Sequence, residues 1–404
     1  MIFSLDVSSF GWNGDLADAL AAAGTDLECG RVALAVHNVC RVWTAAGERD
    51  AVLSGALLDA PAHERPVTGD WVAIEPETGR IRAVLSRCTC VSRKKAGKAC
   101  EEQVLAANVD VLFIVMGLDG DFNIRRLERY LVLAAESGAS PVVVLNKSDL
   151  CGDLAARMRE VDRVTHAPIA AMAAVERGSV SQLHRYVEPG QTAALLGSSG
   201  VGKSTIVNML LGESRQATLP VREDDSRGRH TTTARELFLL PEGWLLLDTP
   251  GMRELEVWTD SGPAATAAFA DIGELAARCR FRDCRHTGEP GCAVAEAVAQ
   301  GRLDVARLGS YHKLERETDA QIIKRRKSTR PTRKDTSYRR TLLCGRCWDA
   351  AMRISTARHS TTYSVPTKAR RAIPFPCTSV PERQRATART STSCATTALS
   401  HGST

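Results

Sequence analysis

The stretch of this chain that decides its fold is Gly197-Ser198-Ser199-Gly200-Val201-Gly202-Lys203-Ser204-Thr205. It follows the apolar run Ala193 to Leu196 and precedes the helical pattern Ile206 to Leu211, as a turn between a buried strand and a helix does. Its glycines let backbone N–H groups turn inward around phosphate oxygens, and the helix dipole adds to the attraction. We expect Lys203 to reach the β- and γ-phosphates and Ser204 to ligate Mg²⁺. The stretch therefore predicts a nucleotide phosphate loop, and the alternative is a Gly-rich turn without a ligand.

A second polar motif, Asn146-Lys147-Ser148-Asp149, ends the apolar run Val142 to Leu145. An aspartate at this place can accept hydrogen bonds from the N1–H and the exocyclic amine of guanine, which adenine cannot supply. We therefore predict that the motif binds the base and selects guanine, so that GTP and GDP are the ligands. The alternative is an ordinary polar turn after a strand.

A third motif, Asp248-Thr249-Pro250-Gly251, ends the apolar run Leu245 to Leu247. Asp248 is placed to hold Mg²⁺ through water, and the N–H of Gly251 to meet the γ-phosphate. Before it lies the polar loop Gly228-Arg229-His230-Thr231-Thr232-Thr233. Its Thr231 and Thr232 are predicted to close on Mg²⁺ and the γ-phosphate, as a switch loop does. An exposed polar turn is the alternative.

The order of the three motifs is unusual. In an ordinary GTPase the base motif follows the phosphate loop, whereas here Asn146 to Asp149 comes about 50 residues earlier. The same parallel α/β sheet can form if the chain is circularly permuted, because the termini of compact domains often lie close together. The predicted fold class is therefore an α/β P-loop domain with permuted connectivity.

The segments before and after this domain differ from it in residue composition and in predicted secondary structure. Short apolar segments between about 30 and 92, broken by Pro66, Gly69 and Gly79, predict a small antiparallel barrel. A helical stretch from about Val294 to Lys324 is expected near the end, and the Arg-, Ser-, Thr- and Pro-rich remainder should be disordered. We place the domains at 1–98 (barrel), 99–273 (nucleotide domain), 274–326 (helical, metal-binding) and 327–404 (basic tail).

The net charge of +6 conceals two opposite regions. Residues 324–404 hold 18 Lys and Arg against three acidic residues, so the rest of the chain is net acidic. A nucleic-acid surface on the body must then be a local patch. The candidate patch is basic and lies between barrel and nucleotide domain: Arg87, Arg93, Lys94, Lys95 and Lys98. A solvated basic linker is the alternative. Because no apolar stretch approaches the ~20 residues needed to cross a bilayer, we expect a cytoplasmic protein.

Three thiols and one imidazole occur within fourteen residues, in the pattern Cys279-x4-Cys284-x-His286-x5-Cys292. This donor set is enough for a closed tetrahedral zinc site, which leaves no open position and is therefore structural. Free buried cysteines are the alternative. Cys344 and Cys347 also have metal-like spacing, but no second ligand pair accompanies them, so we assign them no metal.

These features together resemble the small ribosomal subunit-dependent GTPase A (RsgA) family of circularly permuted GTPases. The resemblance covers about residues 30 to 325 and includes Pro66 to Val72, Gln103 to Asp110 and Asp248 to Leu255. It implies an N-terminal OB-fold barrel, a permuted G domain and a C-terminal zinc domain, acting as a monomer on the 30S subunit and its 16S rRNA. The chain departs from the family at Ala170-Ala171-Met172, where relatives usually show a Ser-Ala behind the base, and its tail has no counterpart.

The residue after the third motif bears on catalysis. Many GTPases place a glutamine there to orient the attacking water, but this chain has Met252. His230 is the internal candidate for that role, which the resemblance supports, and docking on the ribosome would complete the site. We therefore predict a ribosome-stimulated GTPase. The alternatives are an RNA-binding module switched by GTP and GDP with negligible turnover, and a P-loop kinase or ATPase, against which Asp149 argues.

Overall fold

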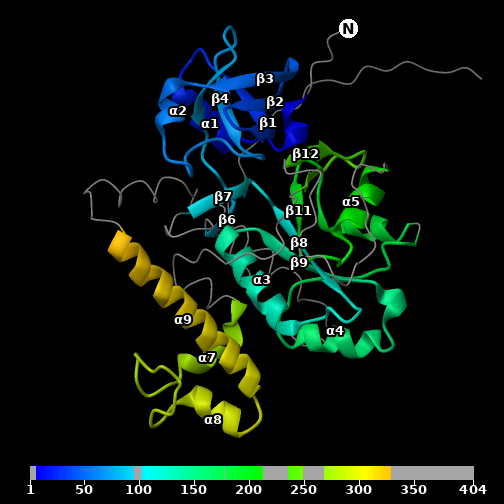
Figure 1. The fold of residues 1–404 in the computed structure, drawn as a ribbon, viewed down its shortest axis with the longest axis vertical. Helices are drawn as coiled ribbons and strands as arrows, with labels where there is room; N and C mark the ends of the chain where they lie inside the picture. The colour runs from blue at the N-terminus through cyan, green and yellow to red at the C-terminus, as the bar shows by residue number, and fades with distance from the viewer. Residues whose placement is uncertain (1–5, 95–101, 177, 213–234, 249–267, 329–404) are drawn as a thin grey trace, which may run out of the picture. The chain divides into compact units, whose positions relative to one another are not determined.

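The computed structural model describes residues 6–94, 102–176, 178–212, 235–248 and 268–328 (Figure 1). The chain divides into one unit of residues 1–358 and another of residues 359–404, and every described residue belongs to the first. Several predicted features lie outside the described residues: His230, Thr231, Thr232, Gly251, Met252, Lys95, Lys98, and the chain beyond 328 with Cys344 and Cys347.

A five-stranded barrel forms the N-terminal region, after the short helices η1 (Val7–Phe10) and α1 (Gly14–Ala23). Its strands are β1 (Glu28–Val36), β2 (Val39–Thr44), β3 (Gly47–Leu53), β4 (Trp71–Ile74) and β5 (Arg80–Val84), with α2 (Gly55–Asp59) between β3 and β4. The order β1-β2-β3-β5-β4 returns to β1, and only β3 and β5 run parallel. In β2 the buried Cys40 and Val42 alternate with the exposed Val39 and Arg41, the period-2 pattern of a half-buried strand. The predicted barrel is confirmed.

The hairpin of β6 (Cys90–Lys94) and β7 (Glu102–Ala107) leads from the barrel into a second sheet region. This region contains β8 (Val111–Gly117), β9 (Ser140–Asn146), β10 (Ile169–Ala171), β11 (Thr192–Leu196), β12 (Glu236–Leu239) and β13 (Leu245–Asp248). Their order is β10-β9-β8-β11-β13-β12, all parallel except β12. β12 also pairs with β1, at Glu236 and Leu34, so the sheet continues into the barrel.

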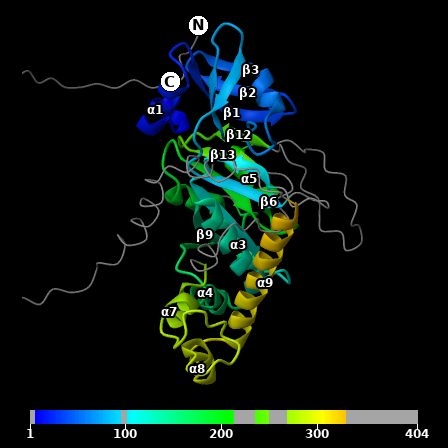
Figure 2. The ribbon, with the colours of Figure 1, turned by 90° about the vertical axis from the view of Figure 1, so that its left-hand side faces the viewer.

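Helices cover both faces of this parallel sheet. Every residue of β8 is buried: Leu112 and Ile114 pack in one apolar cluster, and Phe113 and Val115 in another. Helix α3 (Ile124–Ser137) belongs to the first cluster and lies against β8 and β9 in both views (Figures 1 and 2). Helices η3 (Ser179–Tyr186) and α5 (Lys203–Leu211) belong to the second. Burial on both faces explains why these strands are continuous apolar runs.

One buried cation joins the barrel to the α/β domain. Arg31 of β1 is 3% exposed, and its guanidinium donates to the Thr192 hydroxyl (2.9 Å) and to the Asn108 carbonyl (3.1 Å). The same group lies over the Trp71 ring. Burial lowers the pKa of Arg31 to about 10, which leaves it charged at neutral pH. A buried charge without hydrogen bonds is costly in free energy. The bonds of Arg31 therefore favour the arrangement of β1 and β11 that lets them form.

The C-terminal helices are α7 (Ala270–Ala276), α8 (Ala293–Ala299) and α9 (Val305–Ser328). The sequence predicted a single helical segment from about Val294 to Lys324, but the structure breaks it after Ala299. Gly301 has φ 69°, a left-handed conformation that ends a helix, and Asp304 accepts from the Ala306 N–H to begin the next one. Among the described helices, none is long and apolar enough to span a membrane.

Candidate nucleotide and metal sites

The polar motifs meet at one edge of the sheet because their strands are parallel and end together. Asn146 pairs with Gly117 at the ends of β9 and β8, and Leu196 of β11 pairs with Ile114. Asp248 ends β13, the other neighbour of β11. The carboxyl ends of parallel strands are where open α/β sheets bind ligands. The permuted chain thus brings the base motif, the phosphate loop and Asp248 to a single edge.

The phosphate loop connects β11 to α5. Gly200 and Gly202 adopt φ of 80° and 98°, which L-residues with a side chain avoid. The ammonium of Lys203 donates to the Gly197 carbonyl at 2.7 Å and also to that of Ser198. Helix α5 begins at Lys203, so Ser204 and Thr205 lie in its first turn. The loop therefore presents a helix N-terminus, a lysine and hydroxyls to one place, as an anion site requires.

Asn146 connects the base motif to the phosphate loop. Its side chain is 2% exposed; Nδ2 donates to the Val201 carbonyl (2.8 Å) and Oδ1 accepts from the Ala174 N–H (2.9 Å). A Cβ on Gly202 would lie 2.2 Å from that Nδ2. The predicted site residue Asn146 is thus a buried brace between two loops, and the absence of a side chain at Gly202 is what makes room for it.

The rest of the base motif is more open. Lys147 has φ 63°, and its ammonium pairs with Asp119. Ser148 and Asp149 lie in the short helix η2 (Ser148–Leu150), where Asp149 is exposed. The Ser148 N–H donates to the Met172 carbonyl (3.1 Å). An exposed aspartate on a fixed turn is able to accept hydrogen bonds from a base.

The loop that contacts Asn146 follows β10. Ala170 and Ala171 lie within β10, and the Met172 N–H donates to the Leu145 carbonyl as the strand ends. The backbone that reaches Asn146 is that of Ala174, two residues beyond Met172.

Three residues near these motifs were missed in the sequence. Asp119, Asp121 and Arg126 follow the end of β8 and contact the motifs. Arg126 donates to the Ser198 hydroxyl at 2.7 Å and to Asp121 at 2.7 Å, and the same hydroxyl donates to Asp121. The available signal was their position after a buried parallel strand, since that strand must end at the same edge as β9 and β11.

The predicted basic patch requires a correction. Arg87 is 6% exposed and makes a two-pronged contact with the buried Asp70, at 2.8 Å to each carboxylate oxygen. It also donates to the carbonyls of His63 and Arg65. Arg87 therefore holds the barrel together and does not belong to an RNA-facing surface. Arg93 is half-exposed and donates to Gln103 (3.1 Å).

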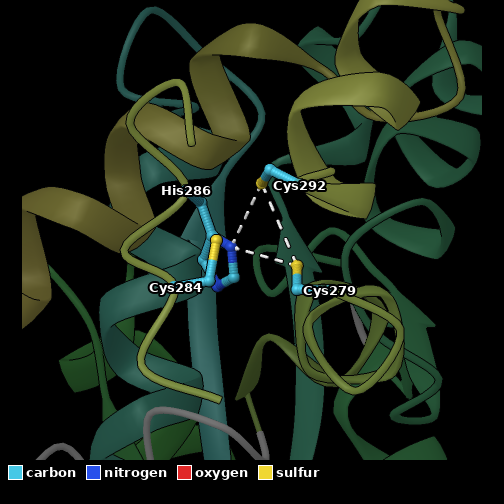
Figure 3. Close-up of side chains that lie close together, drawn as sticks. All are labelled: Cys279, Cys284, His286 and Cys292. Carbon is cyan, nitrogen blue, oxygen red and sulfur yellow. Dashed lines mark hydrogen bonds between the residues drawn. The ribbon is translucent and has the colours of Figure 1, made fainter. Parts of the chain in front are cut away.

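The metal-binding candidates do converge (Figure 3). The ligand atoms of Cys279, Cys284, His286 and Cys292 all lie within 4.8 Å of one another. Nδ1 of His286 is 3.6 Å from the Cys279 Sγ and 3.5 Å from the Cys292 Sγ, and these two sulfurs are 3.9 Å apart. Zn–S bonds of about 2.3 Å and Zn–N bonds of about 2.0 Å at tetrahedral angles place two sulfurs about 3.8 Å apart and a sulfur about 3.5 Å from a nitrogen. The donor set fits zinc in both chemistry and spacing.

The local backbone explains this convergence. His286 has φ 60°, which turns its ring back toward Cys279, and Cys292 begins α8, where its sulfur accepts from the Ala295 N–H (3.3 Å). Burial lowers the pKa of His286, so the ring is neutral at pH 7 and able to bind a metal. Backbone N–H groups of its own residue, Arg285 and Thr287 lower the pKa of Glu289 to about 2, and these bonds close the turn between His286 and Cys292.

Comparison with known proteins agrees with this architecture. Residues 84–258 match the family model of the RsgA GTPase. A small ribosomal subunit biogenesis GTPase RsgA of Opitutus terrae is 46% identical over 329 residues, which is 78% of this chain and 90% of that protein. The protein of the same name from Methanosarcina acetivorans is 44% identical over 78% of this chain and 86% of its own length.

Solved structures show the same fold. The crystal structure of YjeQ from Thermotoga maritima superposes with a TM-score of 0.55 at 27% identity, covering 72% of this chain and 98% of that one. The structure of YloQ, described as a circularly permuted GTPase, has a TM-score of 0.54 at 21% identity, which supports the fold alone. The predicted permuted α/β domain with an N-terminal barrel is thereby confirmed.

Proposed function

Since the chain belongs to the RsgA family of circularly permuted GTPases, we propose that it hydrolyses GTP to GDP and phosphate and acts in the late maturation of the 30S ribosomal subunit. Two relatives that match 78% of this chain are named as small ribosomal subunit biogenesis GTPases. The observation that carries the proposal is the bond from Asn146 to Val201, which joins the guanine motif to the phosphate loop at one sheet edge.

Each motif would have its own role in nucleotide binding and hydrolysis. Asp149 would select guanine, with Lys147 beside it in the same base motif, while the loop from Gly197 to Thr205 would bind the phosphates. A Mg²⁺ ion held by Ser204 and by Asp248 through water would neutralise the developing charge on the phosphates. The oxygen of a water molecule forms a bond to the γ-phosphorus, the bond from that phosphorus to the β,γ-bridging oxygen breaks, and its electron pair leaves with GDP. A proton of the water passes to the released phosphate. Lys203 stabilises the leaving charge on the β-phosphate side.

The groups that orient the attacking water belong to the same proposal. Met252 offers no hydrogen bond to water, so we assign this role to His230, with Thr231, Thr232 and the Gly251 N–H closing on Mg²⁺ and the γ-phosphate. All five residues lie outside the described part of the chain. Hydrolysis would then depend on an ordered loop, and docking on the 30S subunit would supply that order.

The other regions would serve docking. We divide the chain into a barrel (1–98), a G domain (99–273), a zinc domain (274–326) and a basic tail (327–404). The barrel would contact 16S rRNA, as OB-folds commonly bind nucleic acid. One zinc ion on Cys279, Cys284, His286 and Cys292 would fix the loop between α7 and α8 without taking part in chemistry. We propose a cytoplasmic monomer.

Phosphate release tests the proposal. Purified protein should release phosphate from GTP and not from ATP, and addition of 30S subunits should raise the rate several-fold. Release from ATP at a similar rate would replace the proposal with a P-loop ATPase. GTP-dependent binding to 30S subunits without any turnover would favour a nucleotide-switched RNA-binding module, the alternative that Met252 suggests.

A further inference from the structure

We propose that the turn from Leu118 to Phe122 is a positioning element, in which Asp119 holds Lys147 of the guanine motif and Asp121 holds Ser198 of the phosphate loop. This inference rests on the proposed GTP site and assigns it two carboxylates that do not themselves bind nucleotide. The turn connects β8 to α3. One short segment thus contacts both halves of the site.

The turn is fixed at both ends. The Leu118 N–H donates to the Asn146 carbonyl (2.8 Å), which continues the β8–β9 pairing one residue further. Within the turn, the Asp121 N–H donates to Oδ1 of Asp119 (3.2 Å). At its other end, Oδ1 of Asn123 accepts from the N–H groups of Arg125 and Arg126 and caps α3. The two carboxylates therefore project from a rigid backbone.

The Asp119 contact acts on the guanine motif. Lys147 has a left-handed backbone, and its ammonium pairs with Asp119 Oδ2; both side chains are less than one third exposed. Desolvation opposes ionisation of Asp119, but the hydrogen bond and charge of Lys147 together with backbone N–H groups of the turn outweigh it and lower the pKa of this carboxyl. Because the Asp119 carboxylate is charged and neither side chain is freely solvated, the ion pair holds the Lys147 side chain in one rotamer.

The Asp121 contact acts on the phosphate loop. The Ser198 hydroxyl donates to Asp121 Oδ2 and accepts from Arg126 (2.7 Å), which itself pairs with the same carboxylate oxygen (2.7 Å). Both functions of the hydroxyl are used, as donor and as acceptor. The carbonyl of Ser198 meanwhile accepts from Lys203. Asp121 and Arg126 thus hold the side chain of Ser198, and Lys203 holds its main-chain carbonyl.

Nucleotide binding makes the side-chain contact decisive. The Lys203 ammonium has three donors and gives two of them to the carbonyls of Gly197 and Ser198, so these two bonds weaken when the ammonium turns toward a β- or γ-phosphate. The bonds from Asp121 and Arg126 then remain to keep the loop in place. The phosphate loop contacts the phosphates in the ground state and in the transition state alike. Loss of the Asp121–Ser198 contact should therefore weaken nucleotide binding and leave the rate of the chemical step nearly unchanged.

The test compares Ser198→Ala, Asp121→Asn and their combination, with Asp153→Asn as a matched control. Asp153 caps α4 (Leu154–Asp162) by accepting from the Ala156 N–H, a role that asparagine fills equally well. Affinities for GDP and GTP are measured by calorimetry, single-turnover hydrolysis at saturating GTP gives the chemical step, and thermal unfolding checks the fold. Hydrogen bonds to charged groups are weaker when half-exposed than when buried, so we expect a loss of about three- to tenfold in both affinities.

The double variant should lose no more than Ser198→Ala alone, because Ser198→Ala already removes the contact that Asp121→Asn disturbs. The hydrolysis rate of Asp121→Asn at saturating GTP should stay within about twofold of that of the parent. An affinity within twofold of the parent in both single variants would overturn the inference, as would additive losses or a slower chemical step at unchanged affinity. If the parent protein itself fails to bind GDP and GTP, the proposed function falls instead. Asp119→Asn, read against the same control, should also weaken both affinities and should add to Asp121→Asn, because it acts through Lys147.

Discussion

Replacement of Asn146 by alanine tests the connection on which the nucleotide site depends. The amide is 2% exposed and makes two hydrogen bonds, to the Val201 carbonyl (2.8 Å) and from the Ala174 N–H (2.9 Å). A typical intramolecular hydrogen bond contributes about 0.5–1.5 kcal/mol, and a buried partner left unsatisfied costs about 1–3 kcal/mol. Water can enter the small space left by the truncation and bond the exposed partners. We therefore expect Asn146→Ala to lower the free energy of unfolding by about 2 kcal/mol, in the lower part of the combined range.

That free energy should appear in nucleotide binding as well as in folding. If Asn146 holds the phosphate loop against the base motif, the truncated protein must order the loop when GDP binds, and affinity should fall about 10- to 30-fold. The assays are calorimetric titration with GDP and denaturant unfolding without nucleotide. Asn13→Ala serves as the control: Asn13 caps α1 through the Leu16 N–H (3.0 Å), so its loss should cost about 1 kcal/mol of stability and no nucleotide affinity.

A GDP affinity within twofold of the parent in Asn146→Ala would refute the reasoning, since the two loops would then hold their places without the brace. An equal loss of affinity in Asn13→Ala would also refute it. The effect would then follow global stability, and the contact between the loops would have no specific role.

Three further predictions concern individual residues. Asp149→Asn should weaken GTP binding and raise the relative affinity for XTP, whose extra carbonyl replaces a donor; titration with both nucleotides measures this, and an unchanged preference would remove Asp149 from the base site. Protein purified without chelator should contain about one zinc per chain by elemental analysis, lost in Cys284→Ser, because four donors lie within 4.8 Å; less than half an equivalent would count against the site. His230→Ala should abolish most of the 30S-stimulated hydrolysis at nearly unchanged nucleotide affinity, whereas Lys203→Ala should reduce both. Stimulation that survives in His230→Ala would move water positioning to the ribosome or to another residue.

Much of this fold could be predicted from the sequence because its strands and motifs are adjacent in the chain. A fully buried strand such as Val111–Gly117 is an unbroken apolar run, and a phosphate loop is contiguous. The zinc ligands likewise lie within one short segment, whose spacing already limited the possible geometries. Local patterns of this kind need no knowledge of distant contacts.

The errors concern residues whose role depends on partners far away in sequence. Arg87 looked like part of a basic patch, and only the tertiary structure brings Asp70 to its guanidinium. Asp119 and Asp121 were not singled out in the sequence, because a turn with two aspartates is common and neither Lys147 nor Ser198 is near them in the chain. Asn146 was assigned to the nucleotide site, but the sequence did not show that its amide also bonds Val201 and Ala174.

The permuted strand order also fixes the sequence in which the nucleotide site is made. Strands β8, β9 and β10 with the guanine motif are synthesised before β11, whose loop follows Asn146 by roughly 50 residues. At about 5–20 residues per second, this is a delay of several seconds. Because β11 pairs with β8 on one side and β13 on the other, the nascent chain must keep an apolar edge of β8 open throughout that time. A nucleotide can bind the guanine motif and the phosphate loop together only after β11 has inserted between β8 and β13. The free energy of GTP binding therefore stabilises the completed sheet and does not help to start its folding.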